Sequence, residues 1–258
     1  MKERECKVTA RRSAGENLVV LELLADFLSE ATPGQFINVM VPGAGFDPFL
    51  RRPYSISWVN EKAGTLELLV QARGRGSRVL AEVREGESLS VLGPLGKGFP
   101  VEELADAGSV DLIAGACGVA PLLFLAQVLA HKADLSLRLF VGAKSKRLMP
   151  EPEVLQERFP DLTFATEDGS LGYHGTVLDC YSASEDRASV ICACGPGGLM
   201  ESLRRFALRK GVRCYLSLET HMACGFGVCR GCVVRASSGG YLTVCSDGPV
   251  FEASSLAR

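Results

Sequence analysis

The chain has 258 residues, which is enough for two domains of ordinary size. Its formal net charge is −2, so no strong overall field favours binding to nucleic acid or to an anionic membrane. No secretory signal peptide is recognisable at Met1, and the sequence holds ten cysteines. We therefore expect a cytoplasmic protein in which cysteines act as ligands or as small buried apolar residues.

The first hundred residues are rich in short apolar runs separated by turn residues such as Pro33-Gly34 and Glu85-Gly86. Many short strands at this spacing predict a closed antiparallel β-barrel. The stretch 77–83 is the one helical interruption that we expect. The expected strands are 17–24, 36–41, 54–59, 65–71 and 88–92.

Two motifs in this region suit a phosphate-bearing cofactor. In Arg51-Arg52-Pro53-Tyr54-Ser55, a guanidinium could pair with a pyrophosphate and the tyrosine ring could lie on a flavin. In Gly74-Arg75-Gly76-Ser77, a glycine turn at a helix start would present free N–H groups to a phosphate. The alternatives are an edge strand with two solvated arginines and a plain turn capped by Ser77.

After Gly98 the pattern alternates between short apolar strands and helices, which predicts a parallel sheet with helices on both faces. The stretch 110–130 is apolar enough to raise the question of a membrane span. However, Asp111, Gly115, Gly118 and Pro121 interrupt it, and we expect a strand, a turn and a helix there. The expected strands are 110–114, 137–141, 163–166 and 189–194, and the expected helices are 121–132, 152–159, 176–181 and 198–209.

Two glycine-rich loops of this second region follow strands and open helices. They are 115–121, with the sequence Gly-Ala-Cys-Gly-Val-Ala-Pro, and 194–198, with the sequence Cys-Gly-Pro-Gly-Gly. Because both lie at carboxyl ends of parallel strands, they predict a crevice for a dinucleotide. The basic run 144–147 could meet the 2′-phosphate of NADP, although a solvated loop is the interpretation that we favour.

The most informative stretch is Cys224, Cys229, Cys232 and Cys245, spaced C-x4-C-x2-C-x12-C with glycines between them. The first three cysteines follow the plant-type ferredoxin spacing, so the pattern predicts a [2Fe–2S] cluster. A zinc site is the alternative, but zinc frameworks usually contain two C-x2-C pairs. Disulfides are a weaker alternative in a reducing compartment.

In order along the chain, R-P-Y-S, G-x-G-S, G-P-L-G-x-G-F, G-x-x-G-V-A-P and C-G-P resemble the ferredoxin–NADP reductase superfamily. With the cysteine pattern and the ending C-S-D-G-P-V-F, the whole chain resembles the electron-transfer subunits of NAD-dependent (class 1B) dihydroorotate dehydrogenases. The resemblance implies a flavin β-barrel at 1–100, an NAD-binding α/β domain at 101–216 and a [2Fe–2S] module at 217–258.

The resemblance also implies roles for individual residues. FAD contacts are expected from the barrel, NAD contacts from the two glycine loops, and cluster ligands from the four cysteines. Ala116 departs from the family pattern, in which a second glycine is common. The implied set is Arg52, Pro53, Tyr54, Ser55, Leu69, Val70, Gln71, Gly76 and Ser77 for FAD, and Gly115, Gly118, Pro121, Cys194, Gly195 and Pro196 for NAD, with Cys224, Cys229, Cys232 and Cys245 on the cluster.

The implied partner is an FMN-containing catalytic subunit that oxidises dihydroorotate in pyrimidine biosynthesis, in a heterotetramer of two copies of each. Electrons would pass from FMN through the cluster and FAD to NAD⁺. No proton-abstracting group stands out, which fits a relay, and Phe226 and Val228 beside the cluster ligands suggest a docking surface. The alternatives are a flavin–iron–sulfur subunit of a sulfhydrogenase, an NADH-dependent ferredoxin–NADP oxidoreductase, and a redox sensor.

Overall fold

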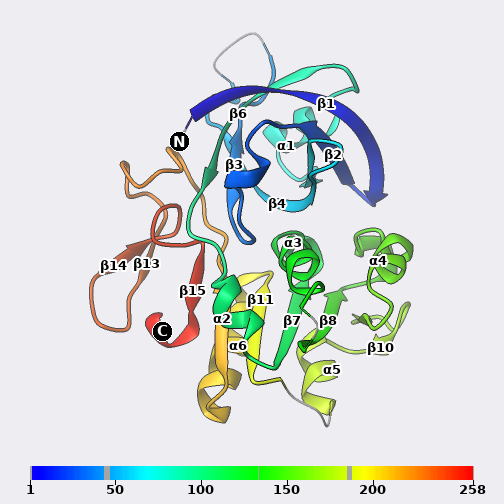
Figure 1. Ribbon diagram of the computed structural model, residues 1–258, viewed down its shortest axis with the longest axis vertical. Coiled ribbons are helices and arrows are strands. Elements are labelled where there is room, and N and C mark those ends of the chain that lie inside the picture. The colour runs from blue at the N-terminus through cyan, green and yellow to red at the C-terminus, as the bar shows by residue number, and fades with distance from the viewer. Residues whose placement is uncertain (1, 44–46, 133, 185–187, 258) are drawn as a thin grey trace.

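A computed structural model describes residues 2–43, 47–132, 134–184 and 188–257. Its N-terminal part is a closed antiparallel barrel with the strand order β1-β2-β5-β4-β3-β6 (Figure 1). The expected barrel is therefore confirmed. Its strands are β1 (Lys2–Gly15), β2 (Leu18–Leu24), β3 (Phe36–Val39), β4 (Arg52–Asn60), β5 (Thr65–Gln71) and β6 (Ser88–Leu95), with the helix α1 (Arg75–Ala81) after β5.

The long first strand is the barrel element that the sequence patterns do not predict. β1 carries many charged residues, and Cys6, Val8 and Ala14 are its only fully buried residues. It is a strand because it pairs with β2 on one side and with β6 on the other, which closes the barrel. A sheet partner, and not apolar alternation, determines this element.

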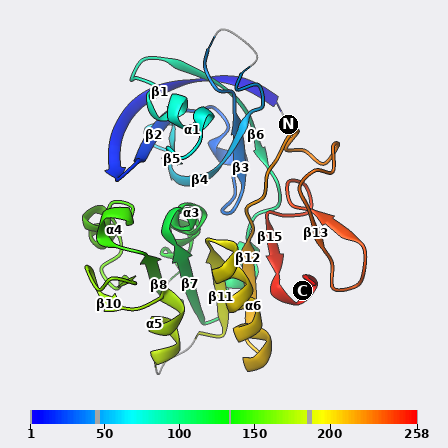
Figure 2. The same cartoon turned by 180° about the vertical axis from the view of Figure 1, so that it is seen from behind.

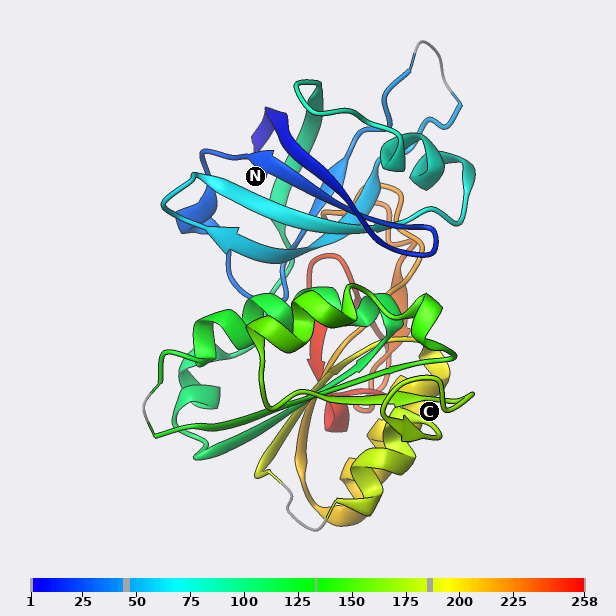
Figure 3. The ribbon, with the colours of Figure 1, turned by 90° about the vertical axis from the view of Figure 1, so that its right-hand side faces the viewer.

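The second part is a seven-stranded sheet with the order β10-β9-β8-β7-β11-β12-β15. All neighbouring strands are parallel except β15, which returns antiparallel to β12. Figure 3 shows α3 on the face of the sheet toward the barrel and α6 on the opposite face. The elements are α2 (Val101–Ala105), β7 (Ser109–Gly115), α3 (Val119–Leu129), β8 (Ser136–Ala143), α4 (Pro152–Arg158), β9 (Thr163–Thr166), β10 (Tyr173–His174), α5 (Val177–Ala183), β11 (Val190–Cys194), α6 (Gly197–Lys210), β12 (Arg213–Ser217) and β15 (Val250–Glu252).

The apolar stretch 110–130 forms β7, a short turn and α3, as expected. Asp111 lies in β7 with no exposed surface, and both of its carboxylate oxygens accept hydrogen bonds of 2.8 Å from Arg138. The backbone N–H of Ala188 donates a third bond at 2.9 Å. Among the described residues, no helix is long and apolar enough to cross a membrane.

A network of buried charges joins the barrel to the α/β domain. Glu67 of β5 accepts hydrogen bonds from Arg12 of β1 at 2.9 Å and from Arg158 of α4 at 3.2 Å. Arg12 also donates to Glu151 at 2.8 Å, and Arg158 lies 4.4 Å from the centre of the Trp58 ring. These contacts hold the two domains in one relative orientation.

The last forty residues contain a small hairpin, β13 (Val233–Arg235) and β14 (Tyr241–Thr243), beside the cysteine-rich loop (Figure 2). Cys232, Val244 and Cys245 are buried in the same apolar cluster as Phe36 of the barrel and Ile113 of β7. The cysteine-rich segment therefore packs on both other parts of the chain and shares their core.

Candidate functional site: a cavity between the domains and a cysteine loop

A cavity of about 430 Å³ opens where the barrel, the α/β domain and the start of the C-terminal segment meet. Its volume lies in the range of small-molecule and cofactor sites. Seven of the nine residues expected to bind FAD line it: Arg52, Pro53, Tyr54, Ser55, Leu69, Gln71 and Ser77. The α/β domain contributes Cys117 and Ala120, and the C-terminal segment contributes residues 217–222.

Arg52 and Arg73 both line this cavity, and Arg52 is the one that belongs to the barrel motif. Its guanidinium lies directly on Gly76, where a Cβ atom would come within 2.9 Å of Nε. Arg52 has no carboxylate partner among the residues that the structure describes, whereas Arg51 is paired with Glu3 and Arg75 with Asp47. Nη1 of Arg52 donates to the backbone carbonyl of Leu50, and a guanidinium at a cavity wall without a carboxylate partner is suited to a phosphate group.

Two of the residues expected to bind FAD, Ser77 and Val70, make contacts outside the cavity. The Ser77 hydroxyl accepts hydrogen bonds from the backbone N–H groups of Arg73 and Gly74, so it caps α1 as well as lining the cavity. The side chain of Val70 points into the barrel core and has no exposed surface. Burial raises the pKa of Tyr54, which also lines the cavity, to about 12, so its phenol stays protonated.

The segment before the cysteine loop supplies four residues of the cavity wall that the sequence did not lead us to expect there. Glu219, Thr220, His221 and Met222 follow β12 and face the barrel motif across the cavity. Burial in the cavity wall raises the pKa of Glu219, and the positive charge of Arg73 partly offsets this rise. No local signal marks these residues, because their position depends on β12, which was not predicted.

The two glycine-rich loops meet at the carboxyl ends of β7 and β11, which are neighbouring strands. A Cβ atom on Gly118 would lie 2.3 Å from the carbonyl oxygen of Cys194, and one on Gly115 would lie 2.7 Å from Pro196. These glycines are therefore required for contact between the loops. Pro121 is buried in α3. A Cβ atom on Gly197, at the first turn of α6, would point into open space.

Two cysteines belong to this loop pair. Burial raises the pKa of Cys117 to about 12, and burial also raises that of Cys194. Both side chains are therefore neutral thiols at ordinary pH. Cys117 lies in the cavity wall, so the first glycine loop reaches the same cavity as the barrel motif.

All ten cysteines lie within the described residues, and none of them forms a disulfide. In the cysteine-rich loop the backbone N–H of Cys229 donates to Sγ of Cys224, and that of Cys245 donates to Sγ of Cys232, both at 3.4 Å. Gly227 N–H donates to Sγ of Cys245 at 3.1 Å. Side-chain hydrogen bonds join the thiols of Cys224 and Cys229, and those of Cys232 and Cys245, into two pairs. The N–H groups of the loop point at sulfur, as in iron–sulfur sites.

The two pairs of thiols differ in their surroundings. Burial raises the pKa of Cys224, but hydrogen bonds from the backbone N–H of Cys229 and of Phe226 outweigh it and lower the pKa to about 6. Burial raises that of Cys245 to about 12. Two pairs of donors fit a group with two metal ions, each taking two thiolates.

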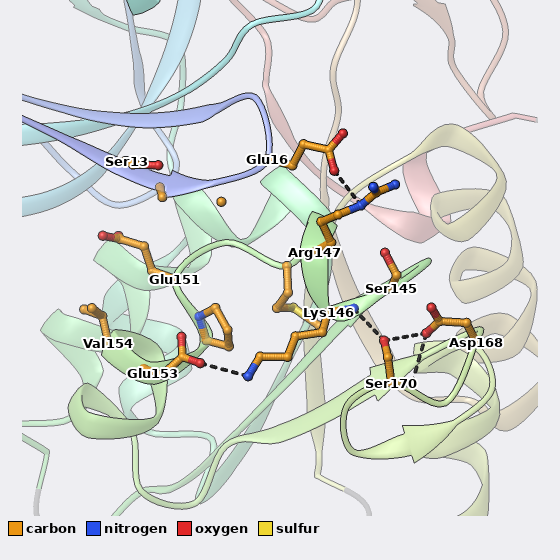
Figure 4. A pocket seen from close by; sticks show the side chains of 14 residues that line it. Ser13, Glu16, Ser145, Lys146, Arg147, Glu151, Glu153, Val154, Asp168 and Ser170 are labelled. Carbon is orange, nitrogen blue, oxygen red and sulfur yellow. Dashed lines mark hydrogen bonds and ion pairs between the residues drawn. The ribbon is translucent and has the colours of Figure 1, made fainter.

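A second cavity, of about 840 Å³, lies between the β1–β2 turn and the loops after β8 and β9 (Figure 4). Lys146 and Arg147 line it, but Lys146 is paired with Glu153 at 3.0 Å and Arg147 with Glu16 at 2.5 Å. Ser170 donates to Asp168 at 2.6 Å and accepts from the backbone N–H of Lys146 at 2.7 Å. Two of the three charges of this basic run, those of Lys146 and Arg147, are thus already paired with carboxylates.

Apolar side chains stand exposed beside the cysteines. Val228 is 75% exposed and Phe226 is 40% exposed, and both precede the exposed Cys229. Residues of this kind next to a redox-active loop are typical of a surface that a partner covers.

Comparison with known proteins connects this geometry to a family. The model of the oxidoreductase FAD-binding domain matches residues 5–99, and that of the iron–sulfur cluster binding domain of dihydroorotate dehydrogenase B matches residues 219–257. The electron transfer subunit of dihydroorotate dehydrogenase B (NAD⁺) from Lysinibacillus sphaericus is 32% identical over 100% of this chain and 99% of its own length. The subunit from Bacillus caldolyticus is 38% identical over 95% of each chain.

Solved structures agree with this relationship. An NADH-dependent reduced ferredoxin–NADP oxidoreductase, studied for flavin-based electron bifurcation, superposes with a TM-score of 0.87 at 25% identity, over 98% of this chain and 89% of that chain. Phthalate dioxygenase reductase superposes with a TM-score of 0.64 at 19% identity, over 93% of this chain and 75% of that chain, which shows a shared fold. With full-length relatives above 30% identity, the chain belongs to the family of dihydroorotate dehydrogenase B electron transfer subunits.

Proposed function

We propose that this chain carries electrons from the flavin of a dihydroorotate-oxidising partner subunit to NAD⁺, in pyrimidine biosynthesis. The observation that carries the proposal is the common cavity, whose walls come from the barrel motif, the first glycine loop and the segment that leads into the cysteine loop. When bound, the cluster would carry single electrons and FAD would exchange them for the electron pair that NAD⁺ takes as hydride. A barrel motif, a glycine loop and the segment that leads into the cysteine loop, all meeting at one cavity, suit such a relay.

For FAD, the barrel residues fit the group. Arg52 would pair with the pyrophosphate, because its guanidinium lacks a carboxylate partner in the described chain and lies against Gly76. Tyr54, held as a neutral phenol, would offer its ring to the flavin, and Ser55 and Gln71 would offer hydrogen bonds from the same wall. We assign Pro53, Leu69, Gly76 and Ser77 to the shape of the site, and Val70 to the strand beneath it.

For NAD, we place the dinucleotide at the carboxyl ends of β7 and β11. Gly115, Gly118, Gly195 and Pro196 would shape this crevice through the contacts that they make with each other. The carboxylate partners of Lys146 and Arg147 support NAD over NADP, because a 2′-phosphate would have to displace them. Pro121 would shape the crevice by fixing the start of α3, and Cys194 would shape it through its backbone carbonyl, which lies against Gly118.

For the cluster, we assign Cys224 and Cys229 to one iron and Cys232 and Cys245 to the other. The exposed Cys229 lies on the side of Phe226 and Val228, so we place the FMN-containing catalytic subunit there. As an electron transfer subunit, the chain acts with a catalytic partner, and we propose two copies of each in the assembly. We propose the parts as 1–100, 101–216 and 217–258, with β15 of the last part completing the sheet of the second.

A second candidate is an NADH-dependent ferredoxin–NADP oxidoreductase subunit, because a structure of that name superposes on 98% of this chain. The two candidates share the flavin, nucleotide and cluster regions. They differ in the partner, so the identity of the subunit that copurifies with the native protein discriminates between them.

Replacing Arg52 tests the flavin site. Arg52→Ala removes a charge-assisted contact worth about 1.5–3 kcal/mol, which is roughly one to two decades of FAD affinity. We expect much of the FAD to be lost during gel filtration, measured as flavin per chain. Arg75→Ala is the matched control, because Arg75 is an exposed arginine next to Gly76, at the start of α1, and is paired with Asp47. FAD retention equal to that of the parent in Arg52→Ala would contradict the assignment.

Replacing Cys245 tests the cluster. We expect Cys245→Ala to lose the iron and the EPR signal of the reduced protein, since one of four ligands is removed. Cys214→Ala should keep both, although Cys214 and Cys245 are equally buried at 1% exposure. A parent protein that holds zinc and gives no reduced-state EPR signal would refute the cluster.

An acidic residue at Gly197 tests the nucleotide site. Gly197→Glu places a negative charge in open space at the first turn of α6, where it should repel a pyrophosphate. A loss of about 0.5–1.4 kcal/mol predicts a roughly two- to tenfold rise in KM for NADH in dye reduction, with FAD and cluster spectra unchanged. Leu208→Glu, at the other end of α6, should leave KM unchanged. An unaltered KM in Gly197→Glu would place the nucleotide elsewhere.

A charge at Phe226 tests the docking surface. Phe226→Asp should weaken binding to the FMN-containing subunit by about tenfold or more, because a carboxylate would be desolvated in an apolar contact. The measurement is the dissociation constant of the complex, with NADH:dye turnover of the free chain as a check on integrity. Leu24→Asp, at an exposed leucine of the barrel, is the control. Equal affinities for the parent and Phe226→Asp would exclude this surface.

A further inference from the structure

Asn38 is a polar residue in the middle of the buried strand β3. Its neighbours Ile37 and Val39 belong to the barrel core, and Asn38 itself is only 1% exposed. Its side chain points to the opposite side of the strand, the side on which Phe36 contacts the core shared with the C-terminal segment. Burying an amide costs free energy unless it is fully hydrogen-bonded.

The Asn38 amide contacts the cysteine loop at its first ligand position. Its Nδ2 donates a hydrogen bond of 3.3 Å to the carbonyl oxygen of Cys224. A Cβ atom on Gly225 would lie 1.9 Å from the same Nδ2, so the amide fills the space that this glycine leaves. Gly225 has a φ of +81°, so the turn also needs glycine for its backbone conformation.

The backbone of Asn38 is joined to the flavin motif. In the barrel sheet Asn38 is paired with Pro53 of β4, the residue between Arg52 and Tyr54. One residue therefore links the strand that carries the flavin motif to the backbone of the first cysteine of the loop. Among the described residues, the bond from Asn38 Nδ2 to the Cys224 carbonyl is the only side-chain hydrogen bond between the barrel and positions 224–232.

The other end of the amide is unsatisfied. Asn38 Oδ1 is buried and has no hydrogen-bond partner in the described structure. An apolar residue of similar shape would avoid this cost and would suit the strand equally well. The hydrogen bond from Nδ2 to the Cys224 carbonyl is therefore the interaction that explains an amide at this position.

We propose that Asn38 is a positioning residue that seats the Cys224–Gly225 turn on β3 and so fixes the cluster loop relative to the flavin site. The inference rests on the proposed function, because it assumes a cluster at Cys224 and a flavin at β4. It concerns the seating of the loop and not the binding of the flavin or the dinucleotide.

The test compares Asn38→Leu and Asn38→Asp with the parent, using the FAD-loaded, cluster-containing protein. Leu removes the amide at nearly constant size, and Asp keeps the shape but replaces the donor by an acceptor that faces the Cys224 carbonyl. We expect iron release to a chelator to be at least about fivefold faster in both, the factor that corresponds to one hydrogen bond of about 1 kcal/mol. The EPR line shape of the reduced cluster should also change, whereas NADH:dye turnover and FAD content should not.

Thr65→Val is the matched control. Thr65 is another buried barrel residue whose hydroxyl lacks a partner in the described structure, but it lies on β5 and makes no contact with the cysteine loop that the structure shows. It should behave as the parent in every assay. If Thr65→Val releases iron as fast as the Asn38 variants, the effect is a general loss of barrel stability, and the proposal is wrong.

Two further outcomes are decisive. Iron release and an EPR line shape equal to those of the parent, in whichever of the two Asn38 variants folds, would overturn the positioning role and leave the proposed function intact. A parent protein whose cluster is not reduced by NADH would contradict the proposed function, while iron release from the variants would still decide the role of Asn38.

Discussion

The orientation of the barrel on the α/β domain is the constraint on which the site depends, and Glu67 is at its centre. Its carboxylate holds Arg12 of the barrel and Arg158 of the other domain, and only 8% of the residue is exposed. Burial raises the pKa of Glu67, but the hydrogen bonds from the two arginines outweigh this and hold it below the ordinary value. Both arginines are partly exposed, and a hydrogen bond to a charged group contributes about 1.5–3 kcal/mol, so the network favours this arrangement of the domains.

The C-terminal segment depends on the same arrangement. After β12, residues 219–222 line the cavity, and the cysteine loop then contacts β3. The segment returns as β15 to the edge of the sheet. Cys232 and Cys245 are buried among side chains of both other parts. The cluster loop is thus held at two places, by the shared core and by Asn38, and its exposed end carries Phe226 and Val228.

The sequence was most informative where chemistry restricts the choice of residue. The cysteine spacing, the glycine loops and the R-P-Y-S motif could be recognised because few other residues can do what they do, and the barrel and the mostly parallel sheet followed from the apolar runs. β1 and β15 could not be predicted in this way, because each is paired with a strand distant in sequence, β1 with β6 and β15 with β12. The position of the cavity segment 219–222 follows from β12, which precedes it. Gly118 illustrates the limit: the motif is recognisable, but only the structure shows that the glycine is required by the backbone of Cys194.

The central claim is that this chain relays electrons and that substrate chemistry takes place on a partner. The most direct measurement is anaerobic NAD⁺ reduction by dihydroorotate, with the purified chain alone, with the FMN-containing subunit alone, and with the two together. The account predicts NADH formation only in the mixture. NADH formation by the chain alone, or none in the mixture when both proteins carry their cofactors, would contradict it.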